Sequence, residues 1–236
     1  MEKITQCLIF PELFERPIHL KFDEPHSSSD GSALLLKAAD RKLQLTSALA
    51  ACLVDGRQEA KVKHTIKDLL RQRIYGLASG YADANDAARL AHDPIFKLLL
   101  DRSPVAGPEL SSQPTLSRFE NTIGPKENYR LGLALAQSII ARQQKRLRGK
   151  VRRITIDLDP TDDPTHGQQQ FSCFNAHYDK HCYLPLLGFL SFNDEPEQYL
   201  VTAVLRPGNA SEKSGVVVGL LARLVALVRA DRKSVV

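Results

Sequence analysis

Apolar residues recur at helical spacing through the first part of the chain. Residues 34–54 show this spacing, and residues 61–78 repeat it. In the second stretch the apolar positions fall on one side of the predicted helix. The other side carries four basic residues, Lys63, Lys67, Arg71 and Arg73. The pattern therefore predicts two amphipathic helices, and the second has a basic face.

Further helices are expected up to residue 148. Asp83 and Asp93 can each cap the start of a short helix, and a proline follows Asp93 as the first helical residue. Residues 131–148 predict a longer helix that is apolar on one side and strongly basic toward its end. Residues 1–32 lack this periodicity, so we expect them to form an irregular arm.

The pattern changes at Gly149, where β-branched residues begin to alternate with polar ones. Residues 151–159 predict a strand, residues 171–192 contain two extended pieces around a turn, and residues 199–206 predict another strand. A helix is expected from Ser211. A helical region thus precedes three strands and one helix, which predicts an α+β chain with a boundary near residue 150.

Charge is distributed unevenly along the chain, although the formal net charge is only +5. Between Lys126 and Arg153 there are nine lysines or arginines and one acid, Glu127. The ten residues that follow contain four aspartates, Asp157, Asp159, Asp162 and Asp163. A basic flank beside an acidic cluster suits a protein that holds a polyanion and a metal ion. A solvated helix followed by an acidic turn would give the same pattern.

Several protein classes are disfavoured by composition. No apolar run approaches the roughly 18 residues that a membrane helix needs. The first residues contain acids and prolines where a signal peptide would be apolar, so we expect a cytoplasmic protein. The four cysteines are unevenly spaced, which fits reduced thiols better than a disulfide framework.

The aspartates at the end of the first predicted strand are the leading candidates for chemistry. Residues two apart in a strand share a face, so Asp157 and Asp159 point the same way. Neighbouring carboxylates repel each other unless a cation lies between them, and Mg²⁺ prefers oxygen ligands. The alternative is that one aspartate caps the following turn while the others are exposed to solvent.

Several motifs follow this strand in a fixed order. They are Asp162 to Gln169 (DDPTHGQQ), His181 to Leu186 (HCYLPL) and Leu205 to Asn209 (LRPGN). Upstream lie Gly80 to Asp86 (GYADAND) and Gln113 to Glu120 (QPTLSRFE). Together they resemble bacterial insertion-sequence transposases of the DDE class, in the branch with a ribonuclease-H-like catalytic domain, from about residue 20 to about residue 228.

The resemblance implies two-metal phosphoryl transfer on DNA. Asp159 matches the first of three catalytic carboxylates, Asp, Asp and Glu, which would hold two Mg²⁺ ions. We expect Asp157, on the same strand face, to be a supporting residue and not the primary metal ligand. The resemblance also implies binding of transposon-end and target DNA, and a homodimer for the full-length enzyme.

The family pattern continues beyond the matched segments. Its second aspartate should lie on a strand after the helix that starts near Ser211, and its glutamate much later. Asp231 follows Arg229-Ala230 as in the family, but the helical spacing that continues to Val228 argues against that role. One frame of a common sequencing adapter encodes residues 231–236, so we expect this tail to be non-native. The chain is accordingly expected to be an inactive fragment.

Four segments summarise the prediction: an arm (1–32), a helical DNA-binding region (33–148), an incomplete ribonuclease-H-like domain of three strands and one helix (149–230), and the tail (231–236). The expected DNA contacts are basic residues on the helices and near their ends. They are Lys63, Lys67, Arg71, Arg73, Arg118, Arg142, Lys145, Arg146, Arg148 and Lys150. A solvated basic face is the alternative for each.

Other candidates are weaker. Cys173, His177, His181 and Cys182 are close in sequence, but they lack the paired knuckles of a zinc site and are better explained as core or turn residues. His166 could approach the scissile phosphate, although a turn histidine is the better explanation. Arg206 and Asn209 are expected to end a strand and cap a helix. Two alternative functions stay open at this point. One is a non-catalytic module that binds transposon ends, and the other is a metal-dependent hydrolase built on the Asp157/Asp159 pair alone.

Overall fold

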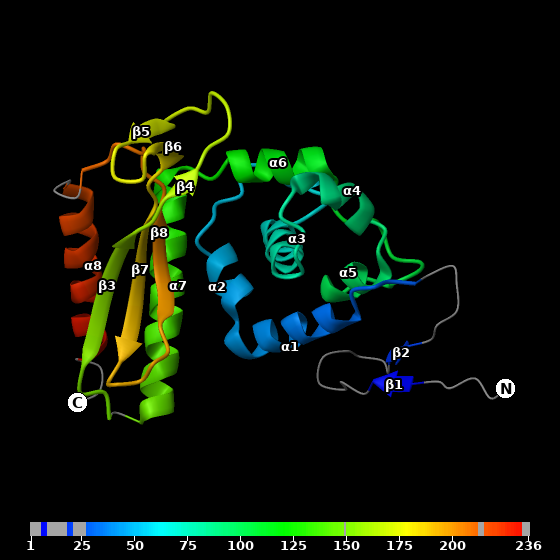
Figure 1. Ribbon diagram of the computed structural model, residues 1–236. Coiled ribbons are helices and arrows are strands. Elements are labelled where there is room, and N and C mark those ends of the chain that lie inside the picture. The colour runs from blue at the N-terminus through cyan, green and yellow to red at the C-terminus, as the bar shows by residue number, and fades with distance from the viewer. Residues whose placement is uncertain (1–5, 9–17, 21–26, 149, 212–214, 233–236) are drawn as a thin grey trace. The chain divides into compact units, whose positions relative to one another are not determined.

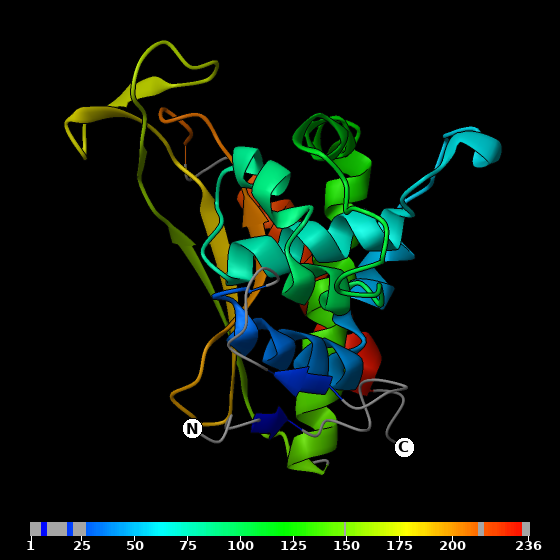
Figure 2. The same ribbon diagram turned by 90° about the vertical axis from the view of Figure 1, so that its right-hand side faces the viewer.

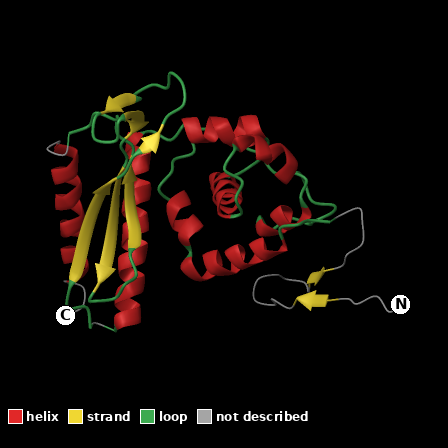
Figure 3. Cartoon of the chain, viewed as in Figure 1, coloured by secondary structure: helices red, strands yellow, loops and turns green. Residues whose placement is uncertain are grey.

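The computed structural model describes residues 6–8, 18–20, 27–148, 150–211 and 215–232. The chain divides into two compact units, Met1–Asn128 and Tyr129–Val236. Helices dominate the first unit, and the second combines antiparallel sheets with long helices (Figure 3). The α+β class predicted from the sequence is therefore confirmed.

The first unit is a set of short helices around two apolar clusters (Figure 1). Phe96 and Leu99 are fully buried in one cluster, and Leu69 and Phe119 lie in the other. The helices are η1 (Gly31–Ala33), α1 (Leu34–Leu43), α2 (Leu45–Ala50), η2 (Glu59–Lys61), α3 (Ile66–Ala78), η3 (Ala84–Asp86), α4 (Ala87–Leu90), α5 (Pro94–Leu99) and α6 (Gln113–Asn121).

Residues 34–54 form two helices where the spacing predicted one. Gln44, between α1 and α2, takes a left-handed φ of 53°. The carboxylate of Asp40 accepts hydrogen bonds from the Thr46 backbone N–H at 2.9 Å and from its hydroxyl at 2.6 Å. Because these groups are buried and must be paired, the chain turns at Gln44 to bring Thr46 back toward Asp40. The prediction of a single helix was wrong for this reason.

Local side chains determine where the other helices begin. α3 starts at Ile66, because the Thr65 hydroxyl accepts from the Asp68 N–H and the Asp68 carboxylate accepts from the Thr65 N–H. The predicted caps are confirmed, since Asp83 accepts from the Asn85 N–H and Asp93 from the Phe96 N–H. These caps satisfy amides that the first turn leaves unpaired.

Part of the expected irregular arm is regular. β1 (Gln6–Leu8) pairs antiparallel with β2 (Ile18–Leu20). Strands of three residues are too short to show the alternation by which a strand is recognised in a sequence. The rest of the arm, up to residue 26, lies outside the described residues.

The second unit contains a central antiparallel sheet with the strand order β3–β7–β8 (Figure 1). The strands are β3 (Ile154–Pro160), β7 (Leu186–Phe192) and β8 (Tyr199–Val204). A bulge interrupts the pairing of β7 with β8 beside Gly188, whereas β3 pairs with β7 in an unbroken register from Ile154–Phe192 to Pro160–Leu186. β3 is therefore the regular edge of this sheet.

Helices α7 (Pro125–Leu147) and α8 (Gly215–Arg232) cover one face of the central sheet. Ala136 and Ile140 of α7 and Leu224 of α8 share a core with Leu190 and Phe192 of β7. The α7 residues from Tyr129 onward thus belong to the second unit, so the compact units divide earlier than the predicted boundary near residue 150.

Backbone groups of β3 face in two directions. Asn193 N–H donates to the Arg153 carbonyl, and Thr161 N–H donates to the Pro185 carbonyl. In an antiparallel strand, successive residues direct their N–H and C=O groups to opposite sides. The two bonds therefore show that the odd-numbered residues of β3 direct theirs toward β7. The backbone groups of Ile154, Ile156 and Leu158 consequently point to the opposite edge, where no described strand pairs with β3.

A second, smaller sheet lies beyond the ends of β3 and β7 (Figure 2). Its strands are β4 (Asp163–Pro164), β6 (Lys180–Tyr183) and β5 (Cys173–Asn175), in that order. Gly208 anchors it, because its carbonyl accepts from the Asn175 amide at 2.6 Å. A Cβ atom at Gly208 would overlap the carbonyl oxygens of Cys173 and Cys182.

The C-terminal helix continues past the predicted end of its apolar pattern. α8 includes Asp231 and Arg232, so Asp231 lies on a helix and not at the end of a strand. The remainder of the predicted tail, residues 233–236, lies outside the described residues. None of the helices in the described ranges is long and apolar enough to cross a membrane.

Gly208→Ala is expected to destabilise the second unit. The added methyl group would meet backbone that cannot move aside, and such overpacking lowers the free energy of unfolding by about 3 kcal/mol. Gly219→Ala in α8 is the matched control, because its Cβ would enter open space and should stabilise the helix by up to about 1 kcal/mol. Urea denaturation followed by circular dichroism measures both, and equal stability of the two variants would contradict the assignment.

Candidate active site and nucleic-acid interface

Asp157 and Asp159 lie on the exposed face of β3. Ile154, Ile156 and Leu158 pack toward the core of the second unit, and the intervening residues are exposed. The register places Asp157 opposite Phe189 and Asp159 opposite Leu187 on β7. The structure therefore bears out the alternation that placed both carboxylates on one face.

The other two aspartates of the acidic segment are arranged differently. Asp162 forms an ion pair with Lys180 of β6 at 2.7 Å. The hydrogen bond from Lys180 lowers the pKa of Asp162 below its usual value, so this carboxylate stays ionised and is neutralised within the chain. Asp163 is an exposed residue of β4, opposite Tyr183. Asp157 and Asp159 are thus the two aspartates of the segment that share the exposed face of the central sheet.

The chemistry of this pair fits a hard divalent cation. Carboxylate oxygens are the ligands that Mg²⁺ prefers, and a Mg²⁺ site commonly uses one or two protein carboxylates together with water and substrate phosphate. Within the described ranges, no group of three His, Cys, Asp or Glu side chains is positioned to hold a metal ion. β3 therefore provides two carboxylates on one face as candidate metal ligands.

The cysteine and histidine cluster is divided between the two faces of the small sheet. Cys182 is buried and His181 is exposed, as adjacent strand residues must be. Burial raises the pKa of the Cys182 thiol, which keeps it protonated and a poor metal ligand. His177 lies in the turn between β5 and β6, and it is exposed. These positions match core and turn roles.

The structure also gives the positions of the three remaining candidates, His166, Arg206 and Asn209. His166 is an exposed loop residue just after β4. Arg206 follows β8 and is buried, and its Nε donates to the Leu184 carbonyl at 3.0 Å. Both Nη atoms of Arg206 are buried without a hydrogen-bond partner in the part of the chain that is described. Asn209 lies in the turn after Arg206 and before α8.

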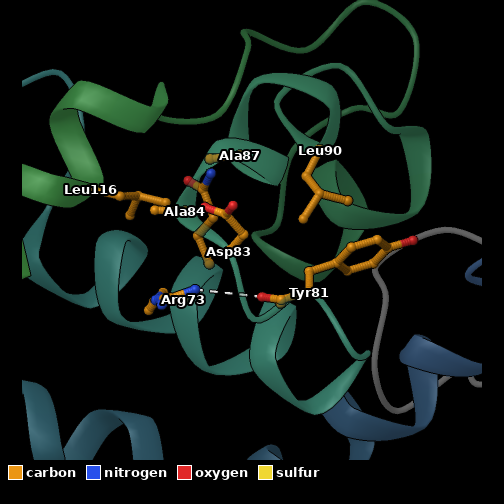
Figure 4. A pocket seen from close by; sticks show the side chains of 9 residues that line it. Arg73, Tyr81, Asp83, Ala84, Ala87, Leu90 and Leu116 are labelled. Atoms are coloured by element: carbon orange, nitrogen blue, oxygen red, sulfur yellow. Dashed lines mark hydrogen bonds between the residues drawn. The ribbon is translucent and has the colours of Figure 1, made fainter. Parts of the chain in front are cut away.

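Two of the predicted DNA contacts are used inside the first unit. Arg71 donates to the Thr46 hydroxyl and to Asp101, and it lies 3.8 Å from the buried Asp40 carboxylate. Arg73 bonds Glu120 and the carbonyls of Tyr81 and Ala82 beside a small cavity of about 10 Å³ (Figure 4). Both side chains are less than one-fifth exposed. Their charges connect helices and loops of this unit.

Two other predicted DNA contacts, Lys63 and Arg118, line a groove of about 1290 Å³ in the first unit. Its floor is apolar and includes Ile66, Leu69 and Phe119. Five lysines or arginines line it against two acids, Asp55 and Glu109. Part of its wall is the segment around η2, which extends away from the helices of this unit (Figure 2). The groove is therefore open and predominantly positive.

Sequence reasoning missed three basic residues of this groove, Arg57, Lys61 and Arg102. Arg57 pairs with Asp55, and Arg102 contacts His64 Nδ1 at 3.1 Å. Burial, and then the nearby Arg102 charge, lower the pKa of His64, so its imidazole is neutral at pH 7. Helical periodicity could not have identified this group, since Arg57, Lys61 and Arg102 come together only when the segment around η2 folds beside the 102–118 region.

The remaining predicted contacts lie elsewhere. Lys67 is half-buried on α3. Arg146 pairs with Glu195 and Gln143, which orients its guanidinium toward the second unit's own surface. The other basic residues at the end of α7 and just beyond it are exposed, and they are Arg142, Lys145, Arg148 and Lys150.

A protein-family model described as Transposase DDE domain group 1 matches residues 10–236. The chain belongs to the DDE-class transposases. Comparisons with curated proteins and with solved structures gave no match. Family membership implies that this transposase binds DNA.

The arginines that the transposase uses internally should be distinguishable from those that line the groove. Arg71→Ala is expected to lower the free energy of unfolding by about 2–3 kcal/mol, because it leaves the buried Asp40 carboxylate without its cation. Lys63→Ala, at an exposed position, should change it by less than about 0.5 kcal/mol. Chemical denaturation of the two variants checks this, and similar effects would show that Arg71 is not structural.

Proposed function

We propose that the function served by this chain is the cutting and rejoining of DNA at insertion-sequence ends, to which it contributes the first of the family's three catalytic carboxylates. We further propose that the second unit belongs to a ribonuclease-H-like domain. The support is the antiparallel succession β3–β7–β8 followed by α8, which packs on one face and leaves the other face with its carboxylates exposed. In this proposal Asp159 is the first catalytic carboxylate.

One observation carries the catalytic assignment. Asp159 lies one residue before the end of β3, exposed, on the same face as Asp157 and with no ion-pair partner among the described residues. In contrast, Asp162 is neutralised by Lys180. Asp159 is therefore available for a cation at the end of a rigid strand, which holds its position better than a loop would.

Asp159 and Asp157 would hold Mg²⁺ at this face. Two such ions, when bound, activate the attacking oxygen and stabilise the leaving oxygen during phosphoryl transfer. The residues of the chain contribute position and charge. β3 fixes the carboxylates through its unbroken register with β7, and Asp157 adds a second negative charge that strengthens cation binding at Asp159.

The groove of the first unit would bind the DNA backbone. Lys61, Lys63 and Arg118 line it and form no ion pair with a described residue, so their charges can neutralise phosphates. The exposed basic residues that follow Ile140 on α7, which include Arg142 and Lys145, would form a second contact. The homodimer that the family resemblance implies stays a prediction.

Asp159→Asn is expected to abolish divalent-cation binding at the end of β3. In the unaltered protein, Mn²⁺ as a paramagnetic substitute for Mg²⁺ should broaden the backbone amide signals of residues 157–159 and of Thr161. Asp163→Asn is the matched control, since it removes one exposed aspartate nearby without touching the β3 face. Equal broadening in all three proteins would refute the site.

The same proteins test catalysis. Two of the family's acids are not assigned to residues of this chain, so we expect no metal-dependent nicking of end-containing DNA by the 236 residues. Nicking that Asp159→Asn abolishes would show that these residues complete an active site. Nicking that survives in Asp159→Asn would remove Asp159 from the mechanism.

Lys63→Ala and Arg118→Ala should each weaken DNA binding on the order of fivefold and lower the salt dependence of binding by about one ion. Lys42→Ala is the control, because Lys42 is an exposed lysine of α1 outside the groove. Gel shifts over a salt series measure the effect. An equal loss in Lys42→Ala would indicate attraction by overall charge alone.

The alternative is a module that binds transposon ends without catalysis. The groove favours it, because its basic residues lie in the first unit and need nothing from β3. This function predicts end-specific gel shifts that are unchanged in Asp159→Asn and independent of Mn²⁺.

A further inference from the structure

The small sheet β4–β6–β5 exposes aromatic rings on one face. Phe174 of β5 is 50% exposed and lies opposite His181 of β6 in the strand register. Their rings meet edge to face, with centroids 5.5 Å apart. Phe171, just before β5, is 64% exposed. We call Phe171, Phe174 and His181 the aromatic face.

The aromatic face does not serve the core of the small sheet. Cys182, adjacent to His181, points to the opposite side and is completely buried. That opposite side packs against Gly208, whose carbonyl accepts from Asn175, and Tyr183 forms a bridge with Pro207. The sheet is thus held from one side, and the aromatic side chains remain on the other.

Phe171 has an unusual backbone conformation as well as an exposed ring. Its φ is 66°, in the left-handed region that glycine or asparagine normally occupies and a bulky side chain disfavours. Burial does not compensate for this conformation, because most of the side chain is in solvent. Such outliers are often maintained by function.

The aromatic face is close to Asp159 along the chain. β4 starts at Asp163, four residues after Asp159, and the whole small sheet is inserted between β3 and β7. Thr161 N–H still bonds the Pro185 carbonyl, so the chain leaves and re-enters the central sheet at the Asp159 end. A DNA strand that reaches Asp159 would pass beside this insertion.

We propose that the aromatic face binds unpaired DNA bases next to the cleavage site by stacking. The inference rests on the proposed function, which brings DNA to Asp159. Planar rings stack on any base, so they would hold a melted strand without selecting its sequence. The exposed amides of Gln168, Gln169 and Gln170 could bond base edges beside the rings.

The composition of this surface favours bases over a protein partner. Its large exposed apolar residues are both phenylalanines, and the nearby aliphatic Leu184 is buried. Lys180 alternates with His181 along β6 and so lies on the side of Cys182, where it is paired with Asp162. A surface of aromatic rings, imidazole and amides matches the stacking platforms of single-strand binding proteins.

The absence of tryptophan from the sequence allows a direct test. Phe174→Trp places a single tryptophan on the aromatic face, and stacking with a base should quench its fluorescence by more than half on saturation with oligothymidine. A duplex of the same length should quench it much less. Val218→Trp, at an exposed position of α8, is the control and should be unaffected by either.

Alanine variants give an independent measurement. Phe174→Ala and Phe171→Ala should each weaken single-strand binding about tenfold and leave duplex binding unchanged, while Phe174→Tyr should retain it. Equal quenching in the Val218→Trp control, no quenching by a bound single strand, or a change in oligomeric state instead of DNA binding would each overturn the proposal.

The outcomes separate this proposal from the one on which it rests. A protein that binds transposon-end duplex but shows no quenching at residue 174 retains the proposed function and loses the stacking site. A protein that binds neither duplex nor single strand refutes both.

Discussion

The register between β3 and β7 is the constraint on which the candidate site depends. It pairs seven consecutive residues without a bulge, and it places Ile154, Ile156 and Leu158 against the core formed with α7 and α8. The alternation of a strand then leaves Asp157 and Asp159 no position except the opposite face. A shift of one residue would bury both carboxylates and expose three apolar side chains. The hydrophobic core therefore fixes where the acids lie.

In the first unit, acidic side chains bind two of the arginines that the sequence offered as DNA contacts. Asp40 is bound by Thr46, by the Tyr75 hydroxyl and by the nearby Arg71. Burial, and then the hydrogen bond to Asp40, raise the pKa of Tyr75, so its hydroxyl stays a donor. Arg73 is likewise held by Glu120. In contrast, Lys61, Lys63 and Arg118 line the groove and form no ion pair with a described residue.

The sequence predicted much of the fold because the relevant signals are local. Alternation placed β3 and β8, and the caps Asp83 and Asp93 were recognisable from side-chain chemistry alone. The break at Gln44 could not be predicted, since it depends on Asp40 reaching Thr46. The packing of Ala136 and Ile140 on the sheet was missed for a similar reason, because periodicity identifies an apolar side of α7 but not what covers it.

The candidate site likewise has one part that could be predicted from the sequence and another that could not. Asp157 and Asp159 are two residues apart in one strand, so their common face follows from geometry within the segment. The groove joins Lys61 and Lys63 to Arg118 across more than fifty positions, and only the folded chain brings them together. Arg71 and Arg73 looked like surface charges on a helical face until their partners, the buried Asp40 and the more exposed Glu120, were placed.

The open edge of β3 determines the geometry of any strand that adds to it. The outward N–H groups belong to Ile154, Ile156 and Leu158, while Pro160 has none to offer, so hydrogen bonding from this edge stops beside Asp159. The alternate side chains of an added strand would lie on the same face as the two aspartates, about 5 Å away. Backbone pairing would thus decide which side chains of the added strand lie next to Asp159. The register between β3 and that strand would determine which residues make up the acidic centre.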